Sequence, residues 1–201
     1  MAGIKRLLYV DADDEARLLM HELLAPHAVD IAVTAAEARA LVHGHSYDLF
    51  VVSGGAADST AIGLCEWLRR VDSRTPIVFC SSDGSARHQT AAIAAGALRY
   101  LVKPLDPTLL RSTLGLLLTL AEFESARAMT VAQRAIEEEL RHHPLTMRVT
   151  AIAPGEQAQG TPDGVLCARA YRAFREAGGN RANFERMWPS ALDEVHRTQT
   201  G

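Results

Sequence analysis

Polar residues stand where predicted apolar strands end, and these are the positions at which the sequence could carry chemistry. The runs end on Asp11, Ser53, Ser81 and Lys103. The carboxyl ends of neighbouring strands form the site of an open parallel sheet, so these side chains are expected to lie together. A carboxylate, two hydroxyls and an ammonium make a polar site, but they include no complete nucleophile–base pair or metal-ligand set. An enzyme is therefore not expected, and no catalytic residue is assigned.

The elements that must position these residues are strands alternating with helices. Continuous apolar runs indicate strands buried on both faces, which is typical of a parallel sheet covered by helices. Asp13 and Thr34 are placed to cap the first two helices. The pattern predicts a doubly wound α/β domain. The predicted strands cover residues 5–10, 28–33, 48–53, 75–81 and 97–102.

Four segments carry a family resemblance over roughly residues 4–120. They read LLYVDADDEAR, YDLFVVS, TPIVFCSS and GALRYLVKP. Together they resemble the receiver domain of bacterial two-component response regulators. The resemblance implies a flavodoxin-like, five-stranded parallel sheet in the order 2-1-3-4-5. It also implies that Asp11 is the first acid of an acidic pair, Ser81 and Lys103 contact phosphate, and Tyr100 is the switch aromatic.

Two positions depart from the family pattern. Ala12 replaces the second acid, which in the family is a direct metal ligand, and Ser53 replaces the phosphate-accepting aspartate. Phosphotransfer to a receiver needs a carboxylate nucleophile and a Mg²⁺ ion held by several oxygen ligands. The sequence therefore predicts a degenerate phosphorylation pocket with no metal and no cofactor. Its residues are Asp11, Ala12, Ser53, Ser81 and Lys103.

Two readings of this pocket stay open. It could be set permanently by a contact between Lys103 and Asp11 with hydrogen bonds from Ser53 and Ser81, or it could be a decayed pocket in which only the fold is retained.

Three other aspartates could substitute for the missing acceptor. Asp13 is expected to cap a helix, Asp14 to face solvent, and Asp58 lies in a loop five residues past the strand end. A phosphorylation-competent regulator with an unusual acceptor is thus an alternative function.

A long helical pattern follows the receiver-like segment. It begins near Pro107 and runs to about Arg141, where His142, His143 and Pro144 end it. We expect three parts: a receiver-like domain at 1–120, a helical connector or dimerisation helix at 121–144, and a small, mostly helical region at 145–201. A solvated spacer is the alternative reading of the connector.

The C-terminal region is expected to contain a strand at 147–153, a loop at 154–164 and a helix at 165–177. Asn180 could cap a short helix, after which Pro189 would open a final turn or helix. Its aromatic residues are expected to form a small helical core or a patch against the first domain.

The segment EAGGNR, residues 176–181, resembles the turn of some helix-turn-helix DNA-binding tails. The would-be recognition helix begins at Pro189 and carries Asp193 and Glu194, which would face phosphates unfavourably. A transcriptional regulator with a divergent tail is therefore a further alternative, and nucleic acid is not the expected partner. The histidines at 43, 45, 142 and 143 have no third ligand at metal-binding spacing, so no metal site is expected.

Composition narrows the class further. The 201 residues carry a net charge of −3, with 48% hydrophobic and 22% charged residues, so nucleic acid and anionic membrane are not favoured. Three separated cysteines and no secretory leader indicate the cytoplasm, and the apolar stretch 114–120 is too short to span a bilayer.

The leading hypothesis is a pseudo-receiver that acts through protein–protein interaction in bacterial signalling. The family resemblance implies a partner face around Tyr100, on the fourth helix, fifth strand and fifth helix, and a homodimer is expected.

Overall fold

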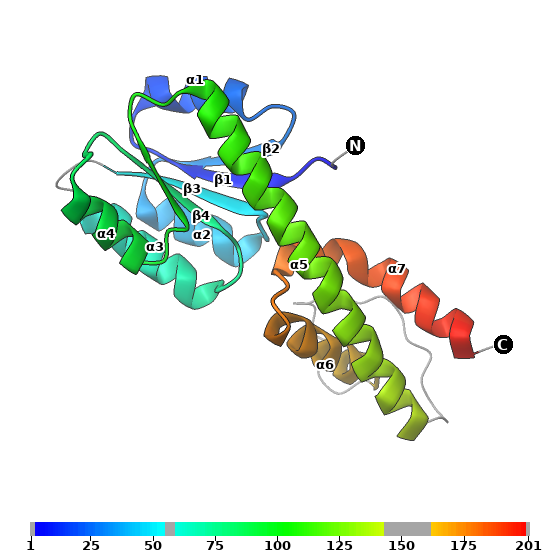
Figure 1. The fold of residues 1–201 in the computed structure, drawn as a ribbon. Coiled ribbons are helices and arrows are strands. Elements are labelled where there is room, and N and C mark those ends of the chain that lie inside the picture. The colour runs from blue at the N-terminus through cyan, green and yellow to red at the C-terminus, as the bar shows by residue number, and fades with distance from the viewer. Residues whose placement is uncertain (1–2, 55–58, 143–161, 200–201) are drawn as a thin grey trace. The chain divides into compact units, whose positions relative to one another are not determined.

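The structure is a computed structural model that describes residues 3–54, 59–142 and 162–199 (Figure 1). Its chain divides into two compact units, residues 1–120 and 121–201. The strands are β1 (Arg6–Val10), β2 (Ala28–Ala32), β3 (Leu49–Gly54), β4 (Ile77–Ser81) and β5 (Arg99–Val102). The helices are α1 (Asp14–Leu23), α2 (Ala35–Gly44), α3 (Ser59–Val71), α4 (Ala86–Ala94), α5 (Pro107–His142), α6 (Pro162–Glu176) and α7 (Arg181–Gln199).

The first unit contains the predicted doubly wound sheet. Its five strands are all parallel and lie in the order β2-β1-β3-β4-β5, which confirms the expected topology. Successive residues of a strand point to opposite faces. Leu8 of β1 therefore packs in the layer under α2, α3 and α4, whereas Leu7 packs in the layer under α1 and the first half of α5. Apolar residues on both faces explain why these strands read as continuous runs.

Local signals at the helix ends behave as predicted. The side chain of Asp13 accepts a hydrogen bond from the Ala16 backbone N–H at 3.0 Å, and Thr34 Oγ1 accepts one from Glu37 N at 3.2 Å. Both bonds satisfy N–H groups that a helix start leaves open. Pro107 begins α5, where a missing N–H costs little, and the helix continues to His142 as expected.

The second unit is a helical cluster with an aromatic core. Phe184 stacks on Trp188 with 5.1 Å between ring centroids, and Phe174 lies 5.1 Å from Phe184. These rings pack against the second half of α5 through buried residues such as Ala128 and Ile136. The expected helical core is therefore present. Among the described residues, no helix has the length and apolar character needed to cross a membrane.

Two boundaries in the C-terminal region differ from the sequence prediction. α7 does not stop before Pro189 but runs through it to Gln199. Proline removes one helical hydrogen bond, yet Trp188 and Ala191 on either side are buried, so packing maintains the helix. α6 begins at Pro162, inside the predicted loop, because proline suits the first turn of a helix. The predicted strand at 147–153 lies outside the described residues.

Candidate functional site

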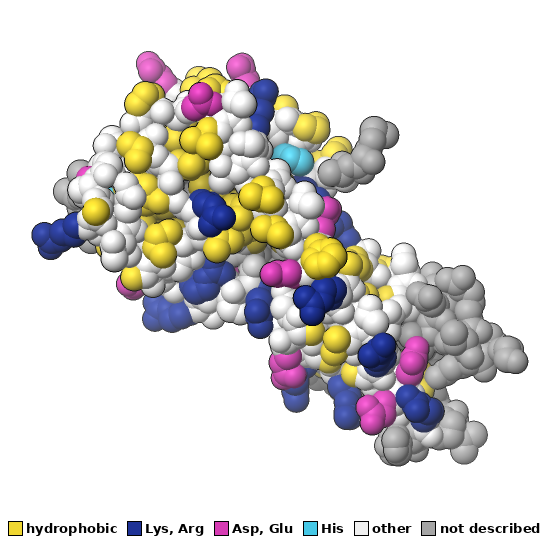
Figure 2. Space-filling view, viewed as in Figure 1, with side chains coloured by type: hydrophobic (Ala, Val, Ile, Leu, Met, Phe, Trp, Pro, Cys, Tyr) yellow, Lys and Arg dark blue, Asp and Glu magenta, His cyan; other side chains and the backbone are white. Residues whose placement is uncertain are grey.

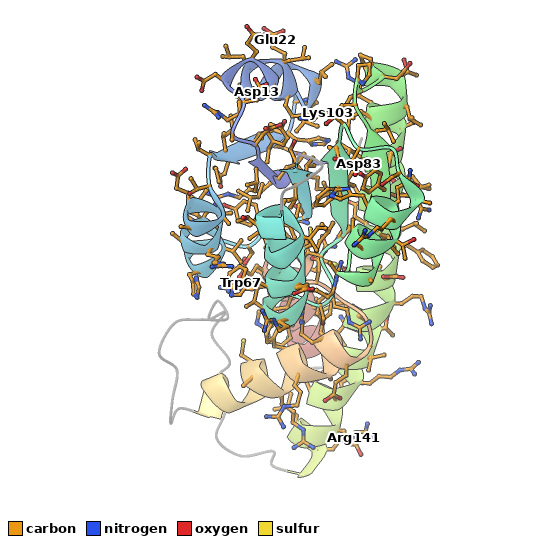
Figure 3. All side chains as sticks on the ribbon, turned by 90° about the vertical axis from the view of Figure 1, so that its left-hand side faces the viewer. Asp13, Glu22, Trp67, Asp83, Lys103 and Arg141 are labelled. Atoms are coloured by element: carbon orange, nitrogen blue, oxygen red, sulfur yellow. The ribbon has the colours of Figure 1, made fainter. Side chains whose placement is uncertain are left out.

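Polar side chains meet at the carboxyl ends of the central strands, around a pocket of about 460 Å³. Parallel pairing brings the end of β3 beside the end of β4, with Ser53 opposite Cys80. Figure 3 shows Asp13 and Lys103 toward the same end of the first unit, with Trp67 toward the other. The polar groups of the lining include Asp11, Asp13, Ser53, Ser82 and Lys103.

Asp11 and Lys103 form an ion pair in this pocket. Lys103 Nζ donates to Asp11 Oδ2 at 2.9 Å, and the Asp11 side chain is only 8% exposed. This is the contact that the first reading of the sequence anticipated. The other carboxylate oxygen, Oδ1, accepts the backbone N–H of Asp13 at 3.1 Å. Both oxygens of Asp11 are therefore hydrogen-bonded within the chain.

Tyr9 also donates a hydrogen bond to Asp11, and this contact was not predicted from the sequence. Its hydroxyl lies 2.6 Å from Oδ2, the same oxygen that Lys103 contacts. Tyr9 and Asp11 are two residues apart, so the alternation of β1 points both side chains to one face. Burial, then the hydrogen bond to Asp11, raises the pKa of Tyr9 far above its ordinary value, so the hydroxyl remains a proton donor. A tyrosine two positions before a strand-end acid is the signal that could have revealed it.

The electrostatics of Asp11 are the balance of two opposing effects. Burial alone would raise its pKa. Hydrogen bonds from Tyr9 and Lys103 come next, followed by the Asp13 N–H and the Ser53 hydroxyl, and together they hold the pKa below its ordinary value. Asp11 is therefore a stable carboxylate at neutral pH.

Ser53 and Ala12 lie where the sequence placed them. Both line the pocket, Ser53 half-buried and Ala12 exposed. Neither can supply a carboxylate. Asp13 caps α1 and Asp14 is exposed on that helix, while Asp58 lies outside the described residues.

Ser81 lies apart from the pocket lining. It is fully buried, and its Oγ accepts the backbone N–H of Asp83 at 3.1 Å. Among the described residues, Ser82 rather than Ser81 lines the pocket.

Tyr100 is held by a small, partly buried hydrogen-bond network. Its hydroxyl donates to the backbone carbonyl of Asp83 and contacts His88 Nδ1 at 2.7 Å. Its ring stacks on Phe79, with 5.6 Å between centroids and an interplanar angle of 15°. Tyr100 has one hydroxyl proton, and the carbonyl can only accept. His88 Nδ1 must therefore carry the proton of the second hydrogen bond.

The helix-turn-helix resemblance meets a structural difference in the second unit. Gly178, with φ of +108°, and Gly179 form the turn between α6 and α7. A Cβ on Gly179 would lie 2.1 Å from the Phe174 ring, so the turn requires glycine there. α7 then continues without a break past Pro189, so no separate recognition helix begins there in the described part of the chain.

A parallel sheet of this order, with an acid, a hydroxyl and a lysine at its strand ends, defines a receiver-type α/β domain. The sequence comparisons agree. The model of the "Response regulator receiver domain" matches residues 7–115. The two-component response regulator PhoP of Pseudomonas aeruginosa is 33% identical over 118 residues, covering 56% of this chain and 51% of PhoP. The transcriptional regulatory protein ZraR of Salmonella typhimurium is 27% identical over 157 residues, covering 75% of this chain and 35% of ZraR.

Solved structures give the same result. A putative response regulator from Chloroflexus aurantiacus is 25% identical with a TM-score of 0.55, covering 58% of this chain and 99% of that protein. The chain therefore belongs to the response regulator receiver domain family. It spans only 28% of the response regulator protein PilR of Pseudomonas aeruginosa and about a third of ZraR.

The residues present do not fit the Mg²⁺ ion that receiver phosphotransfer uses. A hard divalent cation needs several oxygen ligands, usually with carboxylates among them. Asp11 is already hydrogen-bonded through both oxygens, and Asp13 caps α1. No cluster of three or more His, Cys, Asp or Glu side chains able to hold a metal occurs among the described residues.

Proposed function

We propose that this protein is a pseudo-receiver: a receiver-domain signalling protein that is not phosphorylated at the usual position and acts through protein–protein interaction. One observation carries the proposal. Lys103 is paired with Asp11 at 2.9 Å, while the two positions that would supply the metal ligand and the phosphate acceptor are Ala12 and Ser53.

The chemistry of these side chains supports the proposal. A serine hydroxyl is a weak nucleophile unless a base stands beside it. Two carboxylates line the pocket. Asp11 has a lowered pKa and is engaged with Lys103, and Asp13 caps α1, so neither is a good base for Ser53. The pocket residues Asp11, Ala12, Ser53 and Lys103, with Ser81 buried beside them, would then fix one conformation instead of switching between two.

Phosphorylation is tested directly by incubating the full chain with a small-molecule phosphodonor and Mg²⁺ and measuring the intact mass. The expected mass is unchanged. Addition of one phosphoryl group to an aspartate would overturn the proposal and favour a competent regulator with an unusual acceptor. Variants Asp13→Asn, Asp14→Asn and Asp58→Asn would then identify the acceptor.

The partner face proposed for this protein is formed by α4, β5 and α5. These elements and the loop between α4 and β5 carry large apolar side chains that are between 45% and 55% exposed: Ile93, Leu98, Val102, Leu109 and Leu116. In Figure 2, hydrophobic side chains gather on the surface of the first unit that α4 and α5 present in Figure 1. Clustered exposed apolar side chains are typical of interaction sites. Tyr100, fixed by His88 and Asp83, lies within this face.

The partners that this face favours are a second copy of the chain and a protein of a bacterial two-component pathway in the cytoplasm. Leu109 and Leu116 are one heptad apart on α5, the spacing at which paired helices contact each other. Sedimentation velocity of the full chain tests the homodimer. Leu116→Glu should lower the solution mass to that of a monomer, whereas Leu18→Glu, an exposed leucine on α1, should not. A wild-type monomer, or equal masses for both variants, would count against this surface.

A further inference from the structure

Tyr9 is a core residue that contacts the pocket residue Asp11, and neither the missing acceptor nor the missing metal ligand explains it. Its side chain is 1% exposed, in the layer of the core under α1 and α5. An aliphatic residue would fill such a strand position without any polar group to satisfy. The tyrosine hydroxyl instead reaches the end of the sheet and donates to Asp11 Oδ2.

The hydrogen bonds of Asp11 show which of its oxygens this donor occupies. Lys103 Nζ and the Tyr9 hydroxyl share Oδ2, and the Asp13 N–H occupies Oδ1. A carboxylate oxygen accepts about two hydrogen bonds, so the Lys103 and Tyr9 donors fill Oδ2. A cation, or a water molecule bound to one, would have to displace one of them to reach that oxygen. Displacing the Tyr9 hydroxyl would leave a buried donor without an acceptor, which costs the full desolvation of that group.

We propose that Tyr9 is an internal substitute for the divalent cation, and that it keeps the pocket closed to Mg²⁺ even when both missing carboxylates are restored. The proposal rests on the proposed function, because it concerns a receiver pocket that no longer binds metal. It goes further because it gives a third residue, Tyr9, which is not one of the family's acidic positions, a part in keeping Mg²⁺ out of the pocket. The loss of metal binding would then require more than two substitutions to reverse.

The test is a set of full-length variants titrated with Mg²⁺ by isothermal titration calorimetry. Ala12→Asp with Ser53→Asp restores the acids, and adding Tyr9→Phe removes only the hydroxyl. Because a hydrogen bond to a charged group is worth about 1.5–3 kcal/mol, the triple variant should bind Mg²⁺ at least about tenfold more tightly than the double.

The chain offers a matched control at the other end of the sheet. Tyr47 donates to Asp30 Oδ2 at 2.7 Å, and Asp30 pairs with Arg6 at 2.8 Å. Tyr47 comes just before β3, whereas Ser53 lies near the carboxyl end of that strand. The same tyrosine–aspartate–cation arrangement therefore occurs at the end of the sheet away from the pocket. Tyr47→Phe added to the double variant should leave its Mg²⁺ affinity unchanged.

Two outcomes would overturn the proposal: a double variant that binds as tightly as the triple, or a triple variant that does not bind. Tyr9→Leu, which also fills an apolar position without a hydroxyl, replaces Tyr9→Phe if circular dichroism shows that the phenylalanine variant is unfolded. Failure of the proposed function is a separate result. It would appear as Mg²⁺-dependent phosphorylation of the unmodified chain.

Discussion

Replacing Lys103 with methionine removes the cation from the pocket and keeps most of the side-chain volume. Breaking a fully buried ion pair costs about 3–5 kcal/mol, whereas an exposed pair contributes about 0–1 kcal/mol. The Asp11 side chain is 8% exposed and that of Lys103 is 29% exposed. Asp11 also keeps the hydrogen bonds from Tyr9 and Asp13. We therefore expect Lys103→Met to destabilise the first unit by about 2 kcal/mol at neutral pH.

A double-mutant cycle separates the pair from the loss of packing. With Asp11→Asn as the second change, the coupling energy should be about 1–2 kcal/mol, because the double variant no longer contains a buried unpaired charge. Arg6 and Asp30 are the comparison pair, with side chains 38% and 29% exposed. Their coupling should stay below about 1 kcal/mol, since solvent screens them more strongly.

Urea unfolding followed by tryptophan fluorescence gives these free energies of unfolding. Trp67 lies in the first unit and Trp188 in the second, so a Trp188→Phe background leaves Trp67 as the reporter of the sheet. The pKa of Asp11 is lower in the folded state than its ordinary value of 3.8. The stabilisation is thus present above that value and is lost as pH falls through the folded pKa. A coupling below about 0.5 kcal/mol at neutral pH would refute the reasoning.

Three further changes should affect single units. His88→Ala removes the hydrogen bond to Tyr100 and leaves a cavity, and should cost about 2 kcal/mol in urea unfolding followed by Trp67 fluorescence. Asn183→Ala removes hydrogen bonds to the Ala121 carbonyl and to Ser125 Oγ, and should lower the stability of the second unit by about 1–3 kcal/mol, measured through Trp188. Gly179→Ala should unfold the second unit at ambient temperature, seen as loss of helical circular dichroism, because its Cβ would meet the Phe174 ring; a folded variant would contradict this close approach.

The sheet was predictable because strands that are buried on both faces appear in the sequence as continuous apolar runs. The strand at 48–53 could be recognised because Leu49, Phe50, Val51 and Val52 all need an apolar environment, on alternating sides. Helix starts were predictable for a similar reason, since Asp13 and Thr34 act within one turn of the chain. Structural features that depend on a short stretch of chain can therefore be recognised in that stretch of sequence.

The parts that the sequence did not predict depend on contacts between distant elements. Pro189 breaks helices by its own chemistry, and only the burial of Trp188 and Ala191 overrides that preference. Tyr9 counted as one apolar residue in a strand, because the sequence does not show where its hydroxyl ends. The family resemblance implied Ser81 at the pocket, whereas the backbone geometry at the end of β4 buries Ser81 and places Ser82 in the lining.

Position, and not chemistry alone, separates the two tyrosine–aspartate–cation arrangements of this domain. In both, burial is the largest effect on the aspartate pKa and would raise it, and hydrogen bonds from the tyrosine and the cation outweigh it. Around Asp30 this arrangement links the edge strand β2 to its neighbour β1. Around Asp11 the same chemistry occupies the carboxyl end of the sheet, where open parallel folds place their ligands. There the Tyr9 hydroxyl and Lys103 fill Oδ2 of Asp11, an oxygen that a ligand could use, and this position is the reason for proposing that Tyr9 excludes a cation whereas Tyr47 does not.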